Sequence, residues 1–466
     1  MPNSRRDFLL QSTAFTLGMG GLQQLMAVPQ GSGADLASLT AAGYGPLVTD
    51  PAGLLDLPEG FAYQIISRAG ETMDDGLVVP DDPDGMATFA GDDGLCLLMC
   101  NHESTPDKPG VFGKQGEKIS NVDSSKLYDH GYGETPSTGG VTTIVYNTKQ
   151  QRVERQFLRL GGTIRNCAGG PTPWGSWITC EEAVDDPKNN RLKRSRCEQS
   201  HGYAFEVPAT GEPLLHKAEP LRAMGRFRRE AVAVDPVTSI VYQTEDMDDC
   251  CFYRFIPNTP EKLAAGGKVQ ALAITGRNRL DTRNWKQTTV KPGETLTVEW
   301  IDLDNVDSPK DDLRHRAFAA GAARFARAEG IWWTEGESAS QGDLFFVCTS
   351  GGQAKIGQLF RYRPGRKGAP DELELFLEPN NSELIANGDN LCAAPWGDLI
   401  ICEDRKDPVV RLVGVTPSGE LYTLANNQVR GEFAGACFSP DGSTLFVNLQ
   451  TKGLTVAITG PWRGQS

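Results

Sequence analysis

The stretch PTPWGSWITCEE, residues 171–182, joins a turn containing Pro and Gly to an apolar run that ends in a cysteine and two acids. The segment APWGDLIICED, residues 394–404, has the same layout. Weaker copies of the turn, the apolar strand and the polar end occupy residues 92–103, 235–246, 341–352 and 439–450. Six such copies indicate a repeated β unit. They predict an all-β, six-bladed β-propeller with long inter-strand insertions, the alternative being chance recurrence of common strand turns.

The N-terminal segment places the boundary of the folded domain near residue 36. We expect residues 36–466 to form a single six-bladed propeller catalytic domain. Residues 1–35 are expected to be a Tat signal peptide and disordered segment, because Arg5 and Arg6 precede Phe8 and Leu9 and a mildly apolar stretch. This stretch is too short and too polar to span a bilayer. The prediction is therefore a periplasmic or extracellular protein, with the Tat export machinery as partner and no stable membrane insertion.

Charge and cysteine usage exclude several classes of function. The formal net charge of −14 disfavours nucleic-acid binding, although a small anionic substrate remains possible beside bound cations. The 11 cysteines show no paired CxxC spacing, so neither a zinc ribbon nor a disulfide scaffold is indicated. The sequence also lacks the GxSxG, GxxxxGK[ST] and HExxH motifs.

The polar ends of the repeats predict a metal site. In a propeller, equivalent strand ends gather around one axis, and the acidic ends here carry Glu103, Cys180 with Glu181, Glu245 with Asp246, and Glu403. Carboxylates packed this closely raise one another's pKa, and cations remove the conflict. Oxygen donors favour Ca²⁺, whereas a single thiolate indicates iron or zinc. Solvated acids without a metal are the alternative at each strand end.

Two further segments add candidate ligands. In RFARAEG, Arg327 and Glu329 would project to one side of a strand, with Glu329 binding metal and Arg327 an oxyanion. In NGDNLC, Asp389 suits calcium. The alternatives are an exposed ion pair for the first segment and an Asx turn for the second.

These stretches resemble the PhoX-type alkaline phosphatases, a family of Tat-exported bacterial enzymes. The similarity includes NHES (101–104), NCAGGPTPWGSWITCEE (166–182), HGYAFEV (201–207), GRFRREAVAVDP (225–236), RFARAEG (324–330) and NGDNLC (387–392). The resemblance implies a secreted, six-bladed hydrolase of small phosphomonoesters, with a cluster of Fe³⁺ and Ca²⁺ bridged by an oxo group. We expect a monomer. A calcium-dependent lactonase and a non-enzymatic, calcium-stabilised binding propeller are the alternative functions.

The resemblance also implies roles for individual residues. Cys180 and Glu181 match the iron-binding Cys-Glu pair of the family, and the other acidic ligand positions match Glu103, Glu230 and Glu329. Arg327 matches an arginine that holds phosphate, so Arg327 and Glu329 are the expected catalytic residues. The sequence departs from the family at Arg229, where relatives usually have His, and the chain is shorter than most relatives.

Overall fold

A computed structural model describes residues 42–464, except 106, 107, 109, 115, 134, 135, 189–196 and 337–341. These residues belong to one compact unit, Leu39–Ser466. The expected signal segment, residues 1–35, lies outside the described residues. Within the described part of the chain, no helix has the length and apolar character needed to cross a membrane.

The described chain consists mainly of antiparallel strands in five hydrogen-bonded sheets. The first sheet contains β4 (Pro83–Ala90), β5 (Cys96–His102), β6 (Gly139–Asn147) and β7 (Arg152–Thr163). The second contains β8 (Asn166–Pro171), β9 (Ser176–Glu181) and β10 (Ala204–Pro208). The third has nine strands: β11 (Arg229–Val234), β12 (Val241–Glu245), β13 (Tyr253–Pro257), β14 (Gly267–Ile274), β15 (Thr295–Asp302), β16 (Ala328–Glu335), β17 (Gly342–Cys348), β18 (Gln358–Arg363) and β19 (Asp371–Leu377).

The last two sheets bring the two ends of the described chain together. One contains β20 (Gly388–Ala393), β21 (Leu399–Glu403), β22 (Val410–Val415) and β23 (Leu421–Asn427), extended by β2 (Leu55–Pro58) and β1 (Leu47–Val48). The other contains β24 (Phe433–Phe438), β25 (Thr444–Leu449) and β26 (Leu454–Thr459), completed by β3 (Ala62–Arg68). The early strand β3 therefore pairs with the late strand β26, from Ala62 opposite Thr459 to Arg68 opposite Leu454.

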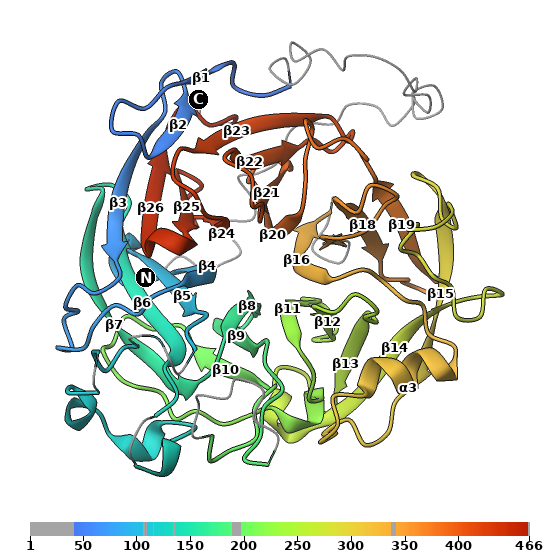
Figure 1. The fold of residues 1–466 in the computed structure, drawn as a ribbon, viewed down its shortest axis with the longest axis horizontal. Helices are drawn as coiled ribbons and strands as arrows, with labels where there is room; N and C mark the ends of the chain where they lie inside the picture. Colours follow the sequence, from blue (N-terminus) through green and yellow to red (C-terminus); the bar gives the residue numbers. More distant parts are fainter. Residues whose placement is uncertain are drawn as a thin grey trace. The chain divides into compact units, whose positions relative to one another are not determined.

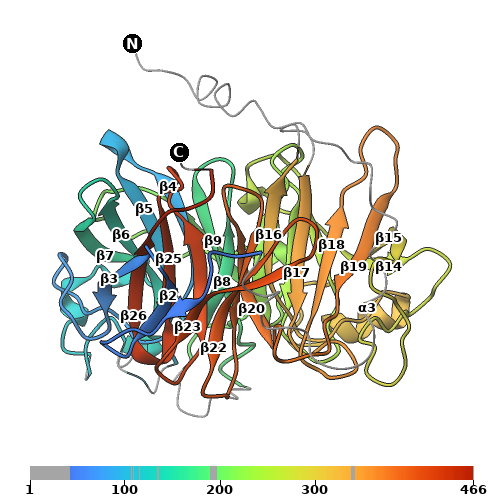
Figure 2. The same cartoon turned by 90° about the horizontal axis from the view of Figure 1, so that it is seen from above.

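Among the described residues, helices are few and short. The α-helix α3 (Leu313–Ala320) packs Leu313 and Ala317 into the core against β14 and lies at the outer side of the molecule (Figure 2). The 3₁₀ turns are η1 (Asp92–Gly94), η2 (Ile119–Asn121), η3 (Ser124–Lys126), η4 (Gly131–Gly133), η5 (Arg222–Met224), η6 (Leu263–Ala265) and η7 (Gln450–Lys452).

The sheets surround a common centre (Figure 1). Six strands line this centre, and each contacts the next: β4, β8, β11, β16, β20 and β24, with β24 again contacting β4. We call these six the inner strands. The all-β prediction is confirmed, and the arrangement is propeller-like.

The pleat of β9 decides which of its side chains can reach the centre. Trp177 packs with Phe205 on one face, whereas Ile178 and Cys180 pack with Val232 on the other. All six residues of β9 are buried, and its hydrophobic side chains point to both faces of the strand. Cys180 therefore belongs to the hydrophobic core.

Candidate metal centre

Each inner strand is joined to the strand that follows it by a backbone hydrogen bond at an equivalent position. The residue just before the inner strand offers its carbonyl oxygen, and the residue just after the second strand donates its N–H. The six donor–acceptor pairs are Glu103–Asp82, Glu182–Arg165, Asp246–Arg228, Thr349–Arg327, Asp404–Asn387 and Gln450–Glu432, with N···O distances from 2.9 to 3.3 Å. The bond brings the beginning of one strand and the end of the next to the same point beside the centre.

Four of the residues before the inner strands have a left-handed backbone. Their φ angles are 47° at Asp82, 45° at Arg165, 50° at Arg327 and 51° at Asn387. This conformation is uncommon for residues other than glycine, and such strain clusters at functional sites. Its repetition at four equivalent positions indicates a shared requirement at the centre.

A β-bulge follows directly in every inner strand. The pairing register shifts after Pro83, Asn166, Arg229, Ala328, Gly388 and Ala434. A bulge re-aims the side chain it contains. In five of the six strands, the second strand residue is a potential metal ligand: Asp84, Cys167, Glu230, Glu329 and Asp389. In the sixth strand it is Ala434.

Small residues next to these ligands allow neighbouring inner strands to approach closely. A Cβ atom added at Gly85 would lie 2.5 Å from the Cα of Ala168 on the next strand. A Cβ atom at Gly330 would lie 2.6 Å from the carbonyl oxygen of Asp389. Real side chains do not tolerate such distances, so these glycines are needed where the ring is narrowest.

The bulge ligands, the acids after the second strands and Glu432, which precedes β24, form one buried to half-buried group, which we call the acidic ring. Its members are Asp84, Glu103, Cys167, Glu182, Glu230, Asp246, Glu329, Asp389, Asp404 and Glu432. Three overlapping sets within it bring their ligand atoms within 4.8 Å of one another: Cys167–Glu182–Glu230, Glu230–Glu329–Asp389 and Asp389–Asp404–Glu432. Glu230 and Asp389 each belong to two sets, so the sets form a continuous chain of donors.

Burial and mutual repulsion disfavour the charged forms of these acids. Burial first, and neighbouring carboxylates second, raise the pKa of Asp389 to about 8. The same causes raise the pKa values of Asp84, Glu230 and Glu329 well above the ordinary range. Asp84 Oδ1 is buried and has no hydrogen-bond partner among the described residues. Cations would satisfy these oxygens and neutralise the repulsion, so the residues present fit a metal centre.

Two arginines meet the acidic ring. Arg165 forms ion pairs with both Glu103 and Glu182. Arg327 binds Asp246 at 2.7 and 3.1 Å, and its Nη2 lies 2.7 Å from Glu329 Oε1. Both side chains remain partly exposed, 30% for Arg165 and 36% for Arg327. They therefore lie where the ring meets solvent.

Six of the residues predicted from the sequence lie together at this centre. They are Glu103, Glu230, Asp246, Arg327, Glu329 and Asp389. Arg229 points away from it, since its guanidinium group donates to Gln243 and to the carbonyl oxygens of Met224 and Gly225. The His-to-Arg departure at this position therefore does not place an arginine among the ring carboxylates.

Three acids that were predicted as ligands do not face the ring, and in each case the next residue of the chain does. Glu181 accepts hydrogen bonds from His201 and from three backbone N–H groups. Glu245 accepts from Tyr253 at 2.8 Å, and Glu403 accepts from the backbone and guanidinium groups of Arg411. All three are the last residue of a strand, and the residue after each one faces the ring. The residues that face the ring at these strand ends are Glu182, Asp404 and Asp246, and the last of these was also predicted from the sequence.

The predicted cysteine ligand is also displaced. The side chain of Cys180 lies in the hydrophobic core with Ile178 and Val232, whereas Cys167 contributes its sulfur to a set with Glu182 and Glu230. The thiol expected at the end of β9 thus comes from the bulge of β8. Sequence reasoning also missed Asp84, Arg165 and Glu432, which follow no motif that would separate them from surface residues.

Similarity to known proteins identifies the family of this chain. The family model described as alkaline phosphatase PhoX matches residues 42–453. The chain belongs to the PhoX alkaline phosphatase family. It is therefore a metal-dependent alkaline phosphatase. A search of curated protein sequences gives no match.

A solved structure of a PhoX protein has a similar fold. The structure of Pseudomonas fluorescens PhoX in complex with vanadate, a transition-state analogue, is 18% identical, with a TM-score of 0.65 over 88% of this chain and 96% of that one. A Pseudomonas aeruginosa periplasmic gluconolactonase is 11% identical, with a TM-score of 0.42 over 84% of this chain and 90% of that one. A Xanthomonas campestris gluconolactonase is 12% identical, with a TM-score of 0.38 over 90% of this chain and 99% of that one.

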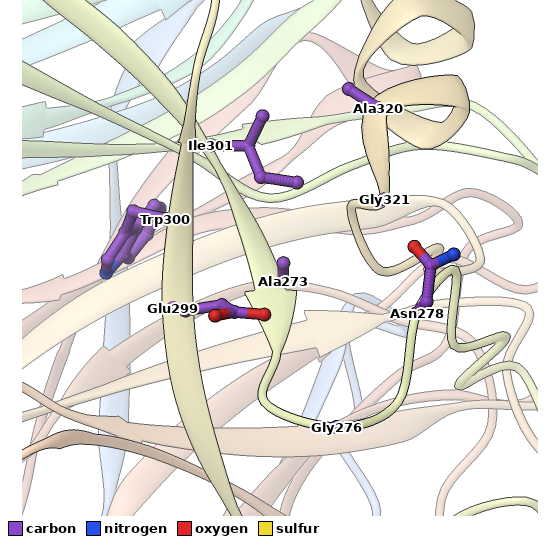
Figure 3. A pocket seen from close by; sticks show the side chains of 8 residues that line it. All are labelled: Ala273, Gly276, Asn278, Glu299, Trp300, Ile301, Ala320 and Gly321. Atoms are coloured by element: carbon purple, nitrogen blue, oxygen red, sulfur yellow. The ribbon is translucent and has the colours of Figure 1, made fainter.

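A surface hollow lies away from the acidic ring of this PhoX family member. It is formed between β14, β15 and the end of α3, with Asn278, Glu299 and Trp300 in its lining (Figure 3). None of its lining residues belongs to the acidic ring.

Proposed function

We propose that the acidic ring holds Fe³⁺ and Ca²⁺ and hydrolyses phosphomonoesters to inorganic phosphate. The observation that carries this proposal is the chain of three overlapping donor sets, delivered by equivalent positions of successive inner strands. Buried carboxylates in this number, with Asp84 Oδ1 unsatisfied, oppose the stability of the metal-free fold. Their retention in a phosphatase is best explained by cation binding.

The donor chemistry suggests which cation each set takes. The set of Cys167, Glu182 and Glu230 contains a thiolate sulfur, which favours iron over calcium. The other two sets supply carboxylate oxygen alone, the donor that Ca²⁺ prefers. Glu230 and Asp389 would each bridge two neighbouring cations.

The protein groups then bind and orient the phosphate. The bound cations would supply the positive charge that stabilises the transition state of phosphoryl transfer. Arg327 is the proposed substrate-binding residue, because it is partly exposed and its planar guanidinium group suits two phosphate oxygens. Asp246 and Glu329 fix the orientation of this group before substrate arrives. Arg165 offers a second guanidinium group across Glu182 and Glu103.

We also infer six blades. The nine-stranded sheet contains two inner strands, β11 and β16, and its edge pairing between β15 and β19 joins two blades into one hydrogen-bonded sheet. The six equivalent backbone bonds and six bulges support this count. Export by the Tat machinery, a periplasmic or extracellular location and a monomeric state remain predictions from the sequence.

Hydrolysis of p-nitrophenyl phosphate at alkaline pH tests the proposed function. We expect turnover by the protein as purified, loss of turnover with a chelator, and recovery only when Fe³⁺ and Ca²⁺ are both returned. Arg327→Ala should lower kcat/KM by about 10²–10³-fold. Arg283→Ala is the matched control, because Arg283 pairs with Asp281 outside the ring and should leave turnover unchanged. Absence of turnover by metal-replete protein would refute the proposal.

A further inference from the structure

A second group of potential metal ligands lies outside the acidic ring. It contains Asp129, Cys197 and His201, whose ligand atoms all lie within 4.8 Å of one another. All three side chains are buried, with exposed fractions of 0%, 4% and 0%. Asp129 precedes β6, and the other two residues lie between β9 and β10. The group therefore joins two insertions at the side of the ring.

The imidazole of His201 is oriented by a carboxylate, as is common for histidines that bind metals. Its Nδ1 lies 2.6 Å from Glu181 Oε1, and its Nε2 lies 3.0 Å from Asp129 Oδ2. Glu181 is fixed in turn by the backbone N–H groups of Ile164, Gly202 and Tyr203. A carboxylate that accepts from Nδ1–H leaves Nε2 free to bind a cation, and such carboxylates commonly support zinc-bound histidines.

Asp129 is also anchored before any cation binds. Its Oδ1 accepts from the N–H of Gly131 at 2.7 Å, and its Oδ2 accepts from the N–H groups of Glu198 and Gln199 at 2.8 and 2.9 Å. The sulfur of Cys197 lies 2.6 Å from the carbonyl oxygen of Gln199. Carboxylate, imidazole, thiol and carbonyl donors thus converge on one buried point.

The simplest alternative is an ion-pair network in which a protonated His201 bridges Asp129 and Glu181. That network accounts for the acids and the imidazole, and the thiol of Cys197 would then only donate a hydrogen bond to the carbonyl oxygen of Gln199. Imidazole nitrogen, thiolate sulfur and carboxylate oxygen are the three ligand types that bind Zn²⁺ in proteins. Hard cations such as Ca²⁺ prefer oxygen donors alone.

We propose that Asp129, Cys197 and His201 bind a structural Zn²⁺ ion, with Glu181 as the positioning residue for His201. This ion would tie the two insertions to the end of β9. Glu182, the next residue, belongs to the acidic ring, so the zinc site would also fix the direction in which Glu182 enters the phosphatase centre. The proposal concerns a site separate from the Fe³⁺ and Ca²⁺ positions and does not depend on their identity.

Zinc content and zinc location test the proposal independently of phosphatase activity. Elemental analysis of the full chain, purified without an immobilised-metal step, should give one zinc equivalent. Cys197→Ala should lose this equivalent and unfold at a temperature several degrees lower. Cys251→Ala is the matched control, because Cys251 is equally buried but hydrogen-bonds only to the carbonyl oxygen of Arg314 in the core. Zinc content that is unchanged in Cys197→Ala would overturn the proposal.

A measurement on the unmodified protein covers the case in which the variants fail to fold. In crystals supplied with Zn²⁺, anomalous scattering at the zinc absorption edge should give a peak within bonding distance of Asp129, Cys197 and His201. An empty position there, in crystals that bind zinc elsewhere, would show that the three residues form an ion-pair network instead.

Discussion

Replacing Asp389 by Asn should stabilise the metal-free protein and weaken the metal-bound protein. Asp389 belongs to two of the three donor sets, and it feels the charges of Asp404, Asp246 and Glu103. Without cations, burial and these neighbours oppose its ionisation. Asparagine has nearly the same shape and carries no charge, so Asp389→Asn removes the repulsion along with the ligand.

The size of the effect follows from the pKa of Asp389, which rises from 3.8 to about 8. The folded protein holds an extra proton between these values, so the stability of the metal-free protein falls as pH rises from about 4 to about 8. Each pKa unit corresponds to about 1.4 kcal/mol, which gives about 6 kcal/mol for a fully buried group. Asp389 is partly exposed, and solvent screening reduces the expected gain in Asp389→Asn to about 2–4 kcal/mol above pH 8.

Urea unfolding of chelator-treated protein at pH 5 and pH 9 measures this difference. Asp389→Asn should be more stable than the wild type at pH 9, more stable by a much smaller margin at pH 5, and deficient in bound calcium when metals are returned. Glu403→Gln is the control, because Glu403 pairs with Arg411 away from the ring and its loss should destabilise at both pH values. If Asp389→Asn is no more stable than the wild type at pH 9, the ring acids do not repel one another as described.

Three further substitutions test the placement of individual side chains. Cys167→Ala should lower bound iron, measured by elemental analysis, and phosphatase turnover by about 100-fold or more. Cys180→Ala should keep its iron and lose only about 1–2 kcal/mol of stability. Equal iron loss in both variants would contradict the assignment. Glu182→Gln should stabilise the chelator-treated protein and abolish most turnover. Glu181→Gln should destabilise that protein by about 3–5 kcal/mol in urea unfolding. Stability changes of the same sign would refute the assignment of Glu182, and not Glu181, to the acidic ring. In Gly330→Val, the added Cβ atom would lie 2.6 Å from the carbonyl oxygen of Asp389 on the next inner strand. This contact should lower the melting temperature by several degrees. An unchanged melting temperature would mean that the two strands can move apart at no cost in stability.

The sequence predicted the repeated unit because its signals are local. A turn with Gly or Pro, an apolar run and a polar end can each be read from a few adjacent residues, and PTPWGSWITCEE contains all three. The final direction of a side chain depends on the pleat and on bulges, which are set by pairing with another strand. This is why Glu181 and Glu403 were predicted as ligands in place of the acids that follow them.

The donors from the inner strands were harder to predict. Cys167 precedes Ala-Gly-Gly in a stretch with no acidic neighbour, and its direction is decided by the bulge between Asn166 and Gly169. Asp84 lies in PDDPDGM, which reads as a solvated acidic turn. In both cases the ligand character arises from the approach of other strands, so no spacing within the local sequence reveals it.

The pairing of β3 with β26 has a consequence for biosynthesis. A ribosome makes β3 near the start of the chain and its partner near the end, so the ring cannot close until Thr459 has been synthesised. The acids delivered by β4 therefore stay apart from those of β20 until translation is almost complete. A chain truncated before Leu454 would lack the strand that pairs with β3, so the ring would remain an open arc.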